Sequence, residues 1–171
     1  ALAAQPGHVG ACHFLIHALE AGRPLDAVAV ADQLLDQVPG SGHLLHMPSH
    51  IYVHVGRFAD AADCNERAIA ADQAYFAAAP AAGFYQLYYA HNLHMLAFAA
   101  MMEGREQLAT ETAARLVADI PASFIEEAPA LVDGLMSTPL HVMVRFGKWE
   151  NILVEPRPPA SRLLSRAQWH Y

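Results

Sequence analysis

A recurring spacing of glycine, alanine and proline constrains this chain most strongly. Gly56-Arg57-Phe58 and Gly147-Lys148-Trp149 place an aromatic residue two positions after a glycine, and Gly22 and Gly104 hold the same place without the aromatic. An alanine-rich amphipathic stretch follows each glycine, and a proline such as Pro39 comes later. Glycine permits a tight turn between antiparallel helices, small residues allow the helices to approach closely, and proline ends the second helix. The pattern therefore predicts repeated helix pairs.

The period divides the chain into successive units. The predicted repeats cover residues 9–39, 42–73, 90–121 and 133–156, with a partial helix over 162–171. Residues 1–6 are interpreted as the end of a preceding repeat. Two insertions, residues 74–89 and 122–132, interrupt the array. Each is interpreted either as a segment that rims a binding face or as a helix extension followed by a turn.

The composition supports an all-α fold. Alanine and leucine dominate, β-branched residues are sparse, and 54% of the residues are hydrophobic, which favours helices over strands and provides a sizeable core. The 171 residues suffice for four or five repeats of about 34 residues each. The chain begins without methionine, and Tyr171 falls inside what reads as a helix, so we expect a fragment of a longer protein.

Charge and cysteine content exclude several classes of function. Ten lysines and arginines stand against seventeen aspartates and glutamates, whereas nucleic-acid binding needs clustered cations, so we expect no nucleic-acid partner. Cys12 and Cys64 lie far apart, which predicts two buried thiols rather than a disulfide scaffold or a zinc knuckle. No run of 18 apolar residues occurs, so we expect no membrane span.

Histidine is the unusual residue, because its eleven copies outnumber all the lysines and arginines together. Helical spacing puts residues three or four positions apart on one side of a helix, and imidazole suits Zn, Cu and Fe. Three of the histidine pairs with this spacing are the predicted ligands of a transition metal: His13 and His17, His46 and His50, and His91 and His94. Convergence of the three pairs would give a three-histidine site with an open position or a six-histidine dinuclear site. Glu20, three residues after His17, is a candidate metal ligand, a candidate hydrogen-bond partner that orients His17, or a candidate general base.

Proline complicates one of these pairs. Pro48 lies between His46 and His50, and proline favours the first position of a helix. We therefore expect a helix that begins at Pro48 and leaves His46 in a loop or a distorted turn. By the same reasoning, Thr138 is expected to cap a helix that begins at Pro139.

The repeat resembles the tetratricopeptide pattern, which has Gly at position 15, an aromatic at 17, Ala at 20 and 27, and Pro at 32. Three strings are similar to a histidine-rich bacterial subfamily of these proteins: PGHVGACHFLIHALE, GHLLHMPSHIYVHVGRFADAADCNERAIAADQAY and YYAHNLHMLAFAAMMEGR. The chain departs from that subfamily at Ala90, where proline is expected, and at His54, where arginine is expected. The resemblance implies an α-solenoid of antiparallel helix pairs.

The resemblance also implies that the first helix of each repeat lines a concave groove, with positions 2, 5, 9, 12 and 13 directed into it. Nine of the eleven histidines occupy these positions, and His8 and His170 do not. The nine are His13, His17, His43, His46, His50, His54, His91, His94 and His141. Tyr52, Tyr88 and Asn92 are further candidates for contact with a bound ligand.

Three functions remain open from the sequence. The first is a binding protein whose groove holds a transition metal or a metal-bearing small ligand. The second is a scaffold that binds a protein or peptide, which is the common role of this fold, with histidines as hydrogen-bond donors. The third is a metal-dependent enzyme that uses Glu20 as its base.

Overall fold

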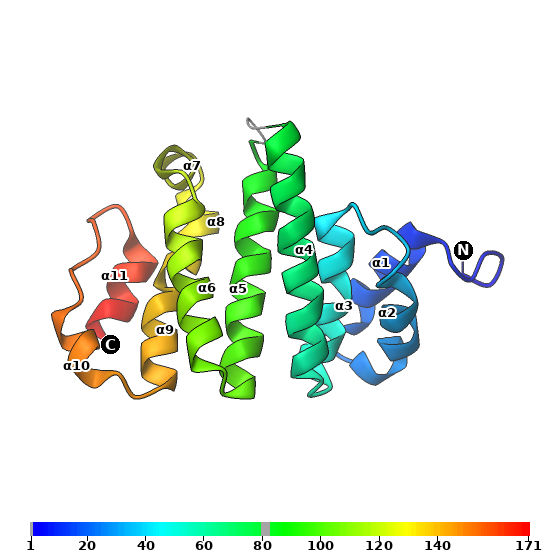
Figure 1. Ribbon diagram of the computed structural model, residues 1–171, viewed down its shortest axis with the longest axis horizontal. Coiled ribbons are helices and arrows are strands. Elements are labelled where there is room, and N and C mark those ends of the chain that lie inside the picture. Colours follow the sequence, from blue (N-terminus) through cyan, green and yellow to red (C-terminus); the bar gives the residue numbers. More distant parts are fainter. Residues whose placement is uncertain (1, 80–82) are drawn as a thin grey trace. The chain divides into compact units, whose positions relative to one another are not determined.

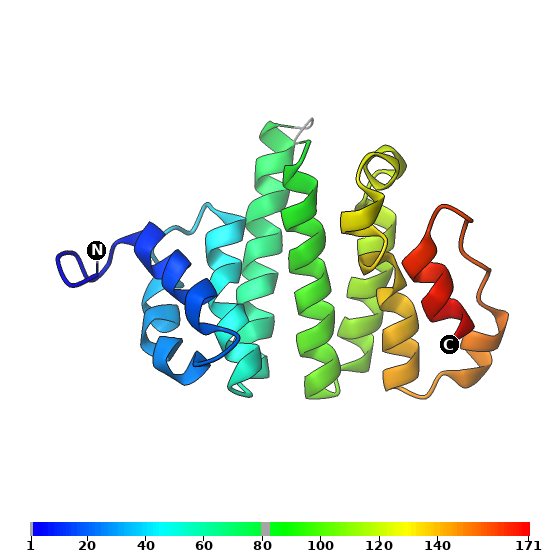
Figure 2. The same ribbon diagram turned by 180° about the vertical axis from the view of Figure 1, so that it is seen from behind.

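The computed structural model describes residues 2–79 and 83–171, and these residues are helical with no strand among them. This confirms the expected all-α class. The chain divides into two compact units, residues 1–81 and 82–171. Figures 1 and 2 show the helices of both units from opposite sides.

The first unit consists of two helix pairs. Its helices are α1 (Val9–Leu19), η1 (Pro24–Ala27), α2 (Val28–Leu34), α3 (Gly42–His54) and α4 (Phe58–Ala78). Helices α1 and α3 begin at side-chain caps, because the side chain of His8 accepts from the Ala11 amide and that of Ser41 accepts from the Leu44 amide. Gly56 has a φ of 79°, which lets the chain turn from α3 directly into α4. The shorter α1–α2 pair packs against α3 of the long α3–α4 pair. Buried residues of these helices include Ile16, Leu34 and Met47.

The second unit repeats this design with shorter elements at its end. Its helices are α5 (Tyr85–Glu103), α6 (Glu106–Asp119), α7 (Ala122–Glu127), α8 (Pro129–Val132), η2 (Leu135–Ser137), α9 (Thr138–Arg145), α10 (Trp149–Val154) and α11 (Leu163–His170). Gly104 and Gly147, with φ of 74° and 67°, form the turns of the α5–α6 and α9–α10 pairs. The carboxylate of Asp133 accepts from the amides of Leu164 and Ser165, which fixes the start of α11.

The helix pairs overlap the predicted repeats, but α4 and α5 extend beyond them into the first insertion. Residues 74–78 continue α4 and residues 85–89 begin α5, as expected for helix extension, while residues 80–82 of that insertion lie outside the described residues. The second insertion forms the short helices α7 and α8. Cys12 and Cys64 are both buried, as predicted.

The predicted effect of Pro48 is wrong, because α3 runs from Gly42 to His54 with Pro48 inside it. Proline at this place removes one backbone hydrogen bond, the one that an N–H at position 48 would donate to Leu44. The Ser41 cap and the packing of α3 against α4 outweigh that loss. His46 is therefore a helical residue, one turn before His50.

The predicted cap at Thr138 is also wrong. Helix α9 already includes Thr138, and Ser137 occupies the capping position. The Thr138 hydroxyl donates to the carbonyl of Leu135 at 2.6 Å instead of accepting from the helix, because the 3-10 turn η2 leads into α9 without a break.

Among the described residues, no helix combines the length and the apolar character needed to cross a membrane.

A tight contact at Gly42 yields a test of the α3–α4 packing. A Cβ atom at Gly42 would lie 2.8 Å from the Ala68 carbonyl oxygen and would overlap the carboxylate of the buried Asp72. We expect Gly42→Ala to lower the free energy of unfolding by about 1–3 kcal/mol, as overpacking typically does. Gly40→Ala is the matched control, because a Cβ there meets nothing within 4 Å. Urea unfolding of both variants checks this expectation, and equal stabilities would contradict it.

Candidate metal site in the first unit

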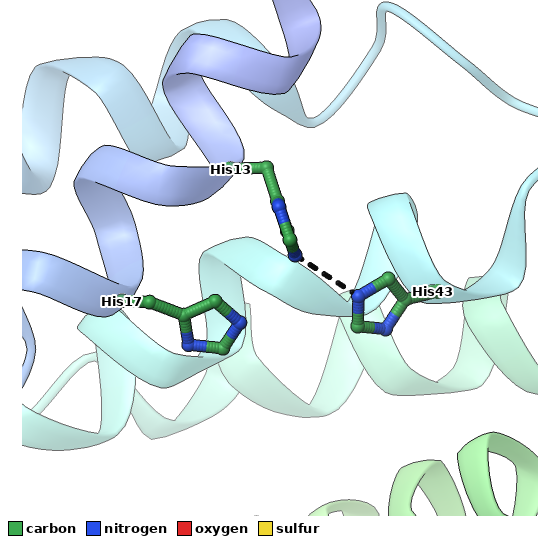
Figure 3. Close-up of side chains that lie close together, drawn as sticks. All are labelled: His13, His17 and His43. Atoms are coloured by element: carbon green, nitrogen blue, oxygen red, sulfur yellow. Dashed lines mark hydrogen bonds between the residues drawn. The ribbon is translucent and has the colours of Figure 1, made fainter.

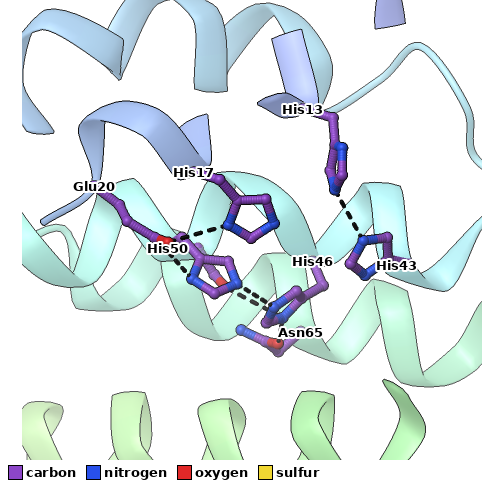
Figure 4. Close-up of polar contacts among 8 residues, drawn as sticks. His13, His17, Glu20, His43, His46, His50 and Asn65 are labelled. Atoms are coloured by element: carbon purple, nitrogen blue, oxygen red, sulfur yellow. Dashed lines mark hydrogen bonds and ion pairs between the residues drawn. The ribbon is translucent and has the colours of Figure 1, made fainter. Parts of the chain in front are cut away.

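Six polar side chains of α1 and α3 face one another between these two helices, as Figure 4 shows. Helix α1 contributes one histidine pair and a glutamate, and α3 contributes three histidines one turn apart. The six residues, called the histidine cluster below, are His13, His17, Glu20, His43, His46 and His50. A seventh residue, Asn65 of α4, forms a hydrogen bond with His46 of the cluster. The structure thus brings together four of the six predicted metal ligands and Glu20.

Asn65 fixes the orientation of the His46 ring. The Asn65 amide nitrogen donates to the Ala61 carbonyl at 2.8 Å, so its oxygen faces His46 Nδ1 at 2.7 Å. A carbonyl oxygen can only accept, so Nδ1 of His46 carries the proton and Nε2 is the acceptor nitrogen of the neutral ring. Both His46 and Asn65 have 0% exposure, so this orientation is set inside the protein.

Glu20 orients two imidazoles with one carboxylate. Its Oε2 lies 2.6 Å from His50 Nδ1, and its Oε1 lies 3.1 Å from His17 Nδ1. His17 is on the same helix as Glu20, whereas His50 is on α3, so the carboxylate joins the two helices. Both Nδ1 atoms act as donors to a carboxylate, which directs the Nε2 lone pairs of both rings elsewhere.

His46 and His50 point their Nε2 atoms at each other across 2.9 Å. Because Nδ1 of each ring is held by an oxygen, a hydrogen bond between the two Nε2 atoms requires one proton more than neutral rings and an ionised Glu20 supply. Burial lowers the pKa of His50, although Glu20 partly offsets this effect. Burial thus disfavours the protonated form of His50, and the Nε2 atoms of the two rings face the same point.

This convergence matches the spacing of two nitrogen ligands on one metal ion. Two nitrogens bound at about 2.05 Å lie about 2.9 Å apart at a right angle and about 3.3 Å apart at the tetrahedral angle. The separation of 2.9 Å between the two Nε2 atoms lies at the lower end of this range. Metal-bound histidines in proteins commonly donate their other ring N–H to a carboxylate or a carbonyl oxygen, as His50 and His46 do here.

A second facing pair lies at the other end of the cluster, as Figure 3 shows. The Nε2 atoms of His13 and His43 are 3.1 Å apart, and the His17 ring meets His13 edge-on with 4.9 Å between centroids. One ring nitrogen from each of these three histidines lies within 4.8 Å of the others.

Burial keeps several of these rings neutral. Desolvation, followed by repulsion from His13, His17 and His50, lowers the pKa of His43 to about 4. The pKa of His13 is lowered by desolvation and by His17. Neutral imidazole is the form that binds metal ions, so these shifts leave both rings ready to act as ligands at neutral pH.

Five other predicted residues of the groove lie in the second unit: Tyr88, His91, Asn92, His94 and His141. His91 and His94 are half-buried on α5, and Asn92 of the same helix is fully buried. Desolvation lowers the pKa of His94, with a smaller contribution from His141 of α9. Tyr88 packs its ring against Phe84 and Tyr85. Participation of His91 and His94 in the same metal site as the first-unit histidines stays a prediction.

Tyr52 has a packing role in the first unit. The ring is 1% exposed, its hydroxyl donates to Asp32 at 2.7 Å, and the Arg57 guanidinium lies 4.2 Å from its centroid. Burial raises the pKa of this hydroxyl, which stays protonated at neutral pH. The hydroxyl group of Tyr52, which a bound ligand would contact, is therefore already hydrogen-bonded to Asp32.

Two residues of the site were missed as functional residues from the sequence. His43 had a groove position, but it was not among the predicted metal ligands. Its spacing of three from His46 suggested a neighbour on the same helix, whereas its Nε2 atom faces that of His13 on α1. Asn65 carried no signal, because it lies on the second helix of its pair and reaches the cluster only through the packing of α3 on α4.

Comparison of the chain with protein-family models, with curated proteins and with solved structures returned no significant match.

The lowered pKa of His43 predicts a loss of stability in acid. The unfolded chain takes up the proton near pH 6.5 and the folded chain only near pH 4, so stability is lost as the pH falls between these values. We expect His43→Gln to reduce this loss by about 1–3 kcal/mol, measured by urea unfolding at about pH 7 and about pH 5. His54→Gln, which removes an exposed imidazole of the same helix, is the control. The expectation fails if His43→Gln and the wild type lose the same stability in acid.

Proposed function

We propose that this protein binds a transition-metal ion through Nε2 of His46 and of His50, with Asn65 and Glu20 as the partners that orient these two ligands. The observation that carries the proposal is the 2.9 Å approach of the two Nε2 atoms while both Nδ1 atoms face oxygen acceptors. Two imidazoles that face each other through Nε2, while oxygen atoms hold both Nδ1 atoms, present the ligand arrangement that a metal ion requires.

The donor set indicates the class of metal. Imidazole nitrogen suits Zn, Cu, Ni and Fe, whereas Mg and Ca prefer oxygen ligands. The facing pair leaves further coordination positions for a third protein ligand, water or a small bound molecule. Glu20 adds a negative charge beside the pair, which favours a cation over an anionic ligand.

The burial of the pair favours a metal over a peptide as the bound partner. His46 is inaccessible to solvent and the side chain of His50 is 18% exposed, so neither ring presents a surface on which a peptide would lie. Glu20 is also a poor candidate for a catalytic base, because each of its two oxygens faces an imidazole Nδ1.

We further propose that the helix pairs are repeats of the tetratricopeptide type and that the histidine cluster belongs to the concave face of the array. Helices α1 and α3 are the first helices of two consecutive predicted repeats, and their histidines face one another as the repeat register requires. Positions 5 and 9 of both helices, occupied by histidine in each, supply four of the six cluster residues.

Zinc titration of protein made without a histidine tag tests the metal site. We expect the wild type to bind Zn²⁺ and His50→Ala to lose most of that affinity, because a ligand to the ion is removed. His54→Ala is the matched control, since His54 is an exposed histidine one turn further along α3. Wild-type protein that retains less than about a tenth of an equivalent of zinc or copper would overturn the proposal. Unchanged affinity in His50→Ala would show that other residues bind the ion.

The orienting role of Glu20 has a separate test. We expect Glu20→Gln to keep the fold but to weaken zinc binding by about 10–100-fold, as the loss of a residue that hydrogen-bonds to a metal ligand typically does. Asp26→Asn controls for the loss of one negative charge, because Asp26 is an exposed carboxylate of the same unit that pairs with Arg23. Affinities measured by competition with a zinc-binding dye give the comparison. If both variants lost the same zinc affinity, Glu20 would act only through its negative charge and not by orienting the histidines.

A further inference from the structure

The histidine cluster holds more ligand atoms than one ion uses. His46 and His50 form one facing pair, whereas His13 and His43 form another, with their Nε2 atoms 3.1 Å apart. The second pair has a third imidazole beside it, because the His17 ring lies edge-on to His13. One nitrogen from each of His13, His17 and His43 falls within 4.8 Å of the other two.

The three rings approach from two directions, which is the arrangement that an ion needs. His13 and His17 are four residues apart on α1 and so project from one side of that helix, and His43 projects towards them from the start of α3 (Figure 3). The 3.1 Å between the His13 and His43 nitrogens lies within the range of about 2.9–3.3 Å set by two nitrogen ligands of one ion.

Glu20 connects the two ligand sets. One carboxylate oxygen faces Nδ1 of His17, which belongs to the first set, and the other faces Nδ1 of His50, which belongs to the second. The Nδ1 atom of His17 is therefore a donor to the carboxylate, and Nε2 is the nitrogen left to act as a ligand. A single anionic residue thus orients one ligand in each set.

We propose that His13, His17 and His43 bind a second transition-metal ion, so that the cluster holds two ions whose ligands are joined through Glu20. Three imidazoles with no protein carboxylate in the inner sphere suit Zn²⁺ or Cu²⁺ and leave one position for water or an exchangeable ligand. This inference extends the proposed function to a second site of the same cluster, and it rests on ligands that the first site does not use.

The number of zinc ions bound per chain distinguishes the two proposals. Equilibrium dialysis against Zn²⁺ followed by elemental analysis should give two ions for the wild type, one for His13→Gln, one for His43→Gln and one for His50→Gln. His54→Gln should still bind two. Circular dichroism and urea unfolding establish that each variant is folded before its zinc content is compared.

Each outcome decides one proposal or both. One ion in the wild type, retained in His13→Gln and lost in His50→Gln, would overturn the second site and leave the first. One ion that is lost in His13→Gln but retained in His50→Gln would support the site argued here and overturn the first. Two ions that survive His13→Gln and His43→Gln would overturn the second site, and two that also survive His50→Gln would overturn both. No ion in the wild type would likewise overturn both.

A measurement on the wild-type protein tests the second site even if one of the variants does not fold. Nuclear magnetic resonance of the imidazole groups during zinc addition should show the signals of His13 and His43 changing together, in a step separate from that of His46 and His50. Signals of His13 and His43 that stay unchanged up to saturation with zinc would overturn the second site.

Discussion

The carboxylate of Glu20 is the contact on which the rest of the histidine cluster depends. It lies at the end of α1, yet it bonds His50 in the middle of α3, so it aligns the two helices at the point where their histidines meet. By accepting from Nδ1 of both His17 and His50 it sets the tautomer of each ring and hence the direction in which each Nε2 points. If this anion were absent, the rings of His17 and His50 would lose the acceptor that sets their orientation.

The packing of α3 against α4 supplies the second constraint. Gly42 lets the start of α3 approach the Ala68 carbonyl and the buried Asp72, and this close approach carries Asn65 to within 2.7 Å of His46. The amide of Asn65 is itself held by Ala61, so the orientation of the His46 ring follows from backbone packing rather than from a flexible surface contact. A ligand that is oriented in this way loses little conformational freedom when it binds an ion.

The helix pairs were predictable because their signals are local. Gly56, Gly104 and Gly147 mark turns through their left-handed backbone, and spacing of three or four residues puts His13 with His17 on one side of α1. The predicted break at Pro48 was wrong because a single residue preference was weighed without the packing of α3 on α4. The tertiary contacts of a helix can outweigh the loss of one backbone hydrogen bond.

The contacts between helices could not be predicted in the same way. The spacing of Glu20 from His17 suggested their contact, but the bond to His50 exists only because α1 lies against α3. The pairing of His43 with His13 and of Asn65 with His46 likewise joins residues 30 and 19 positions apart. Such pairs depend on how side chains interlock after the helices have packed, which a repeat pattern does not specify.

The two acceptors behind the facing pair differ in charge, and this difference makes the pair electronically unequal. His50 donates to a carboxylate, which shifts electron density towards Nε2 and makes that nitrogen the stronger base, whereas His46 donates to a neutral amide. An ion on the pair would consequently have a shorter, tighter bond to His50 and a weaker one to His46. In the proposed site, His46 would therefore be the ligand that exchanges more readily, because its partner is the neutral amide of Asn65.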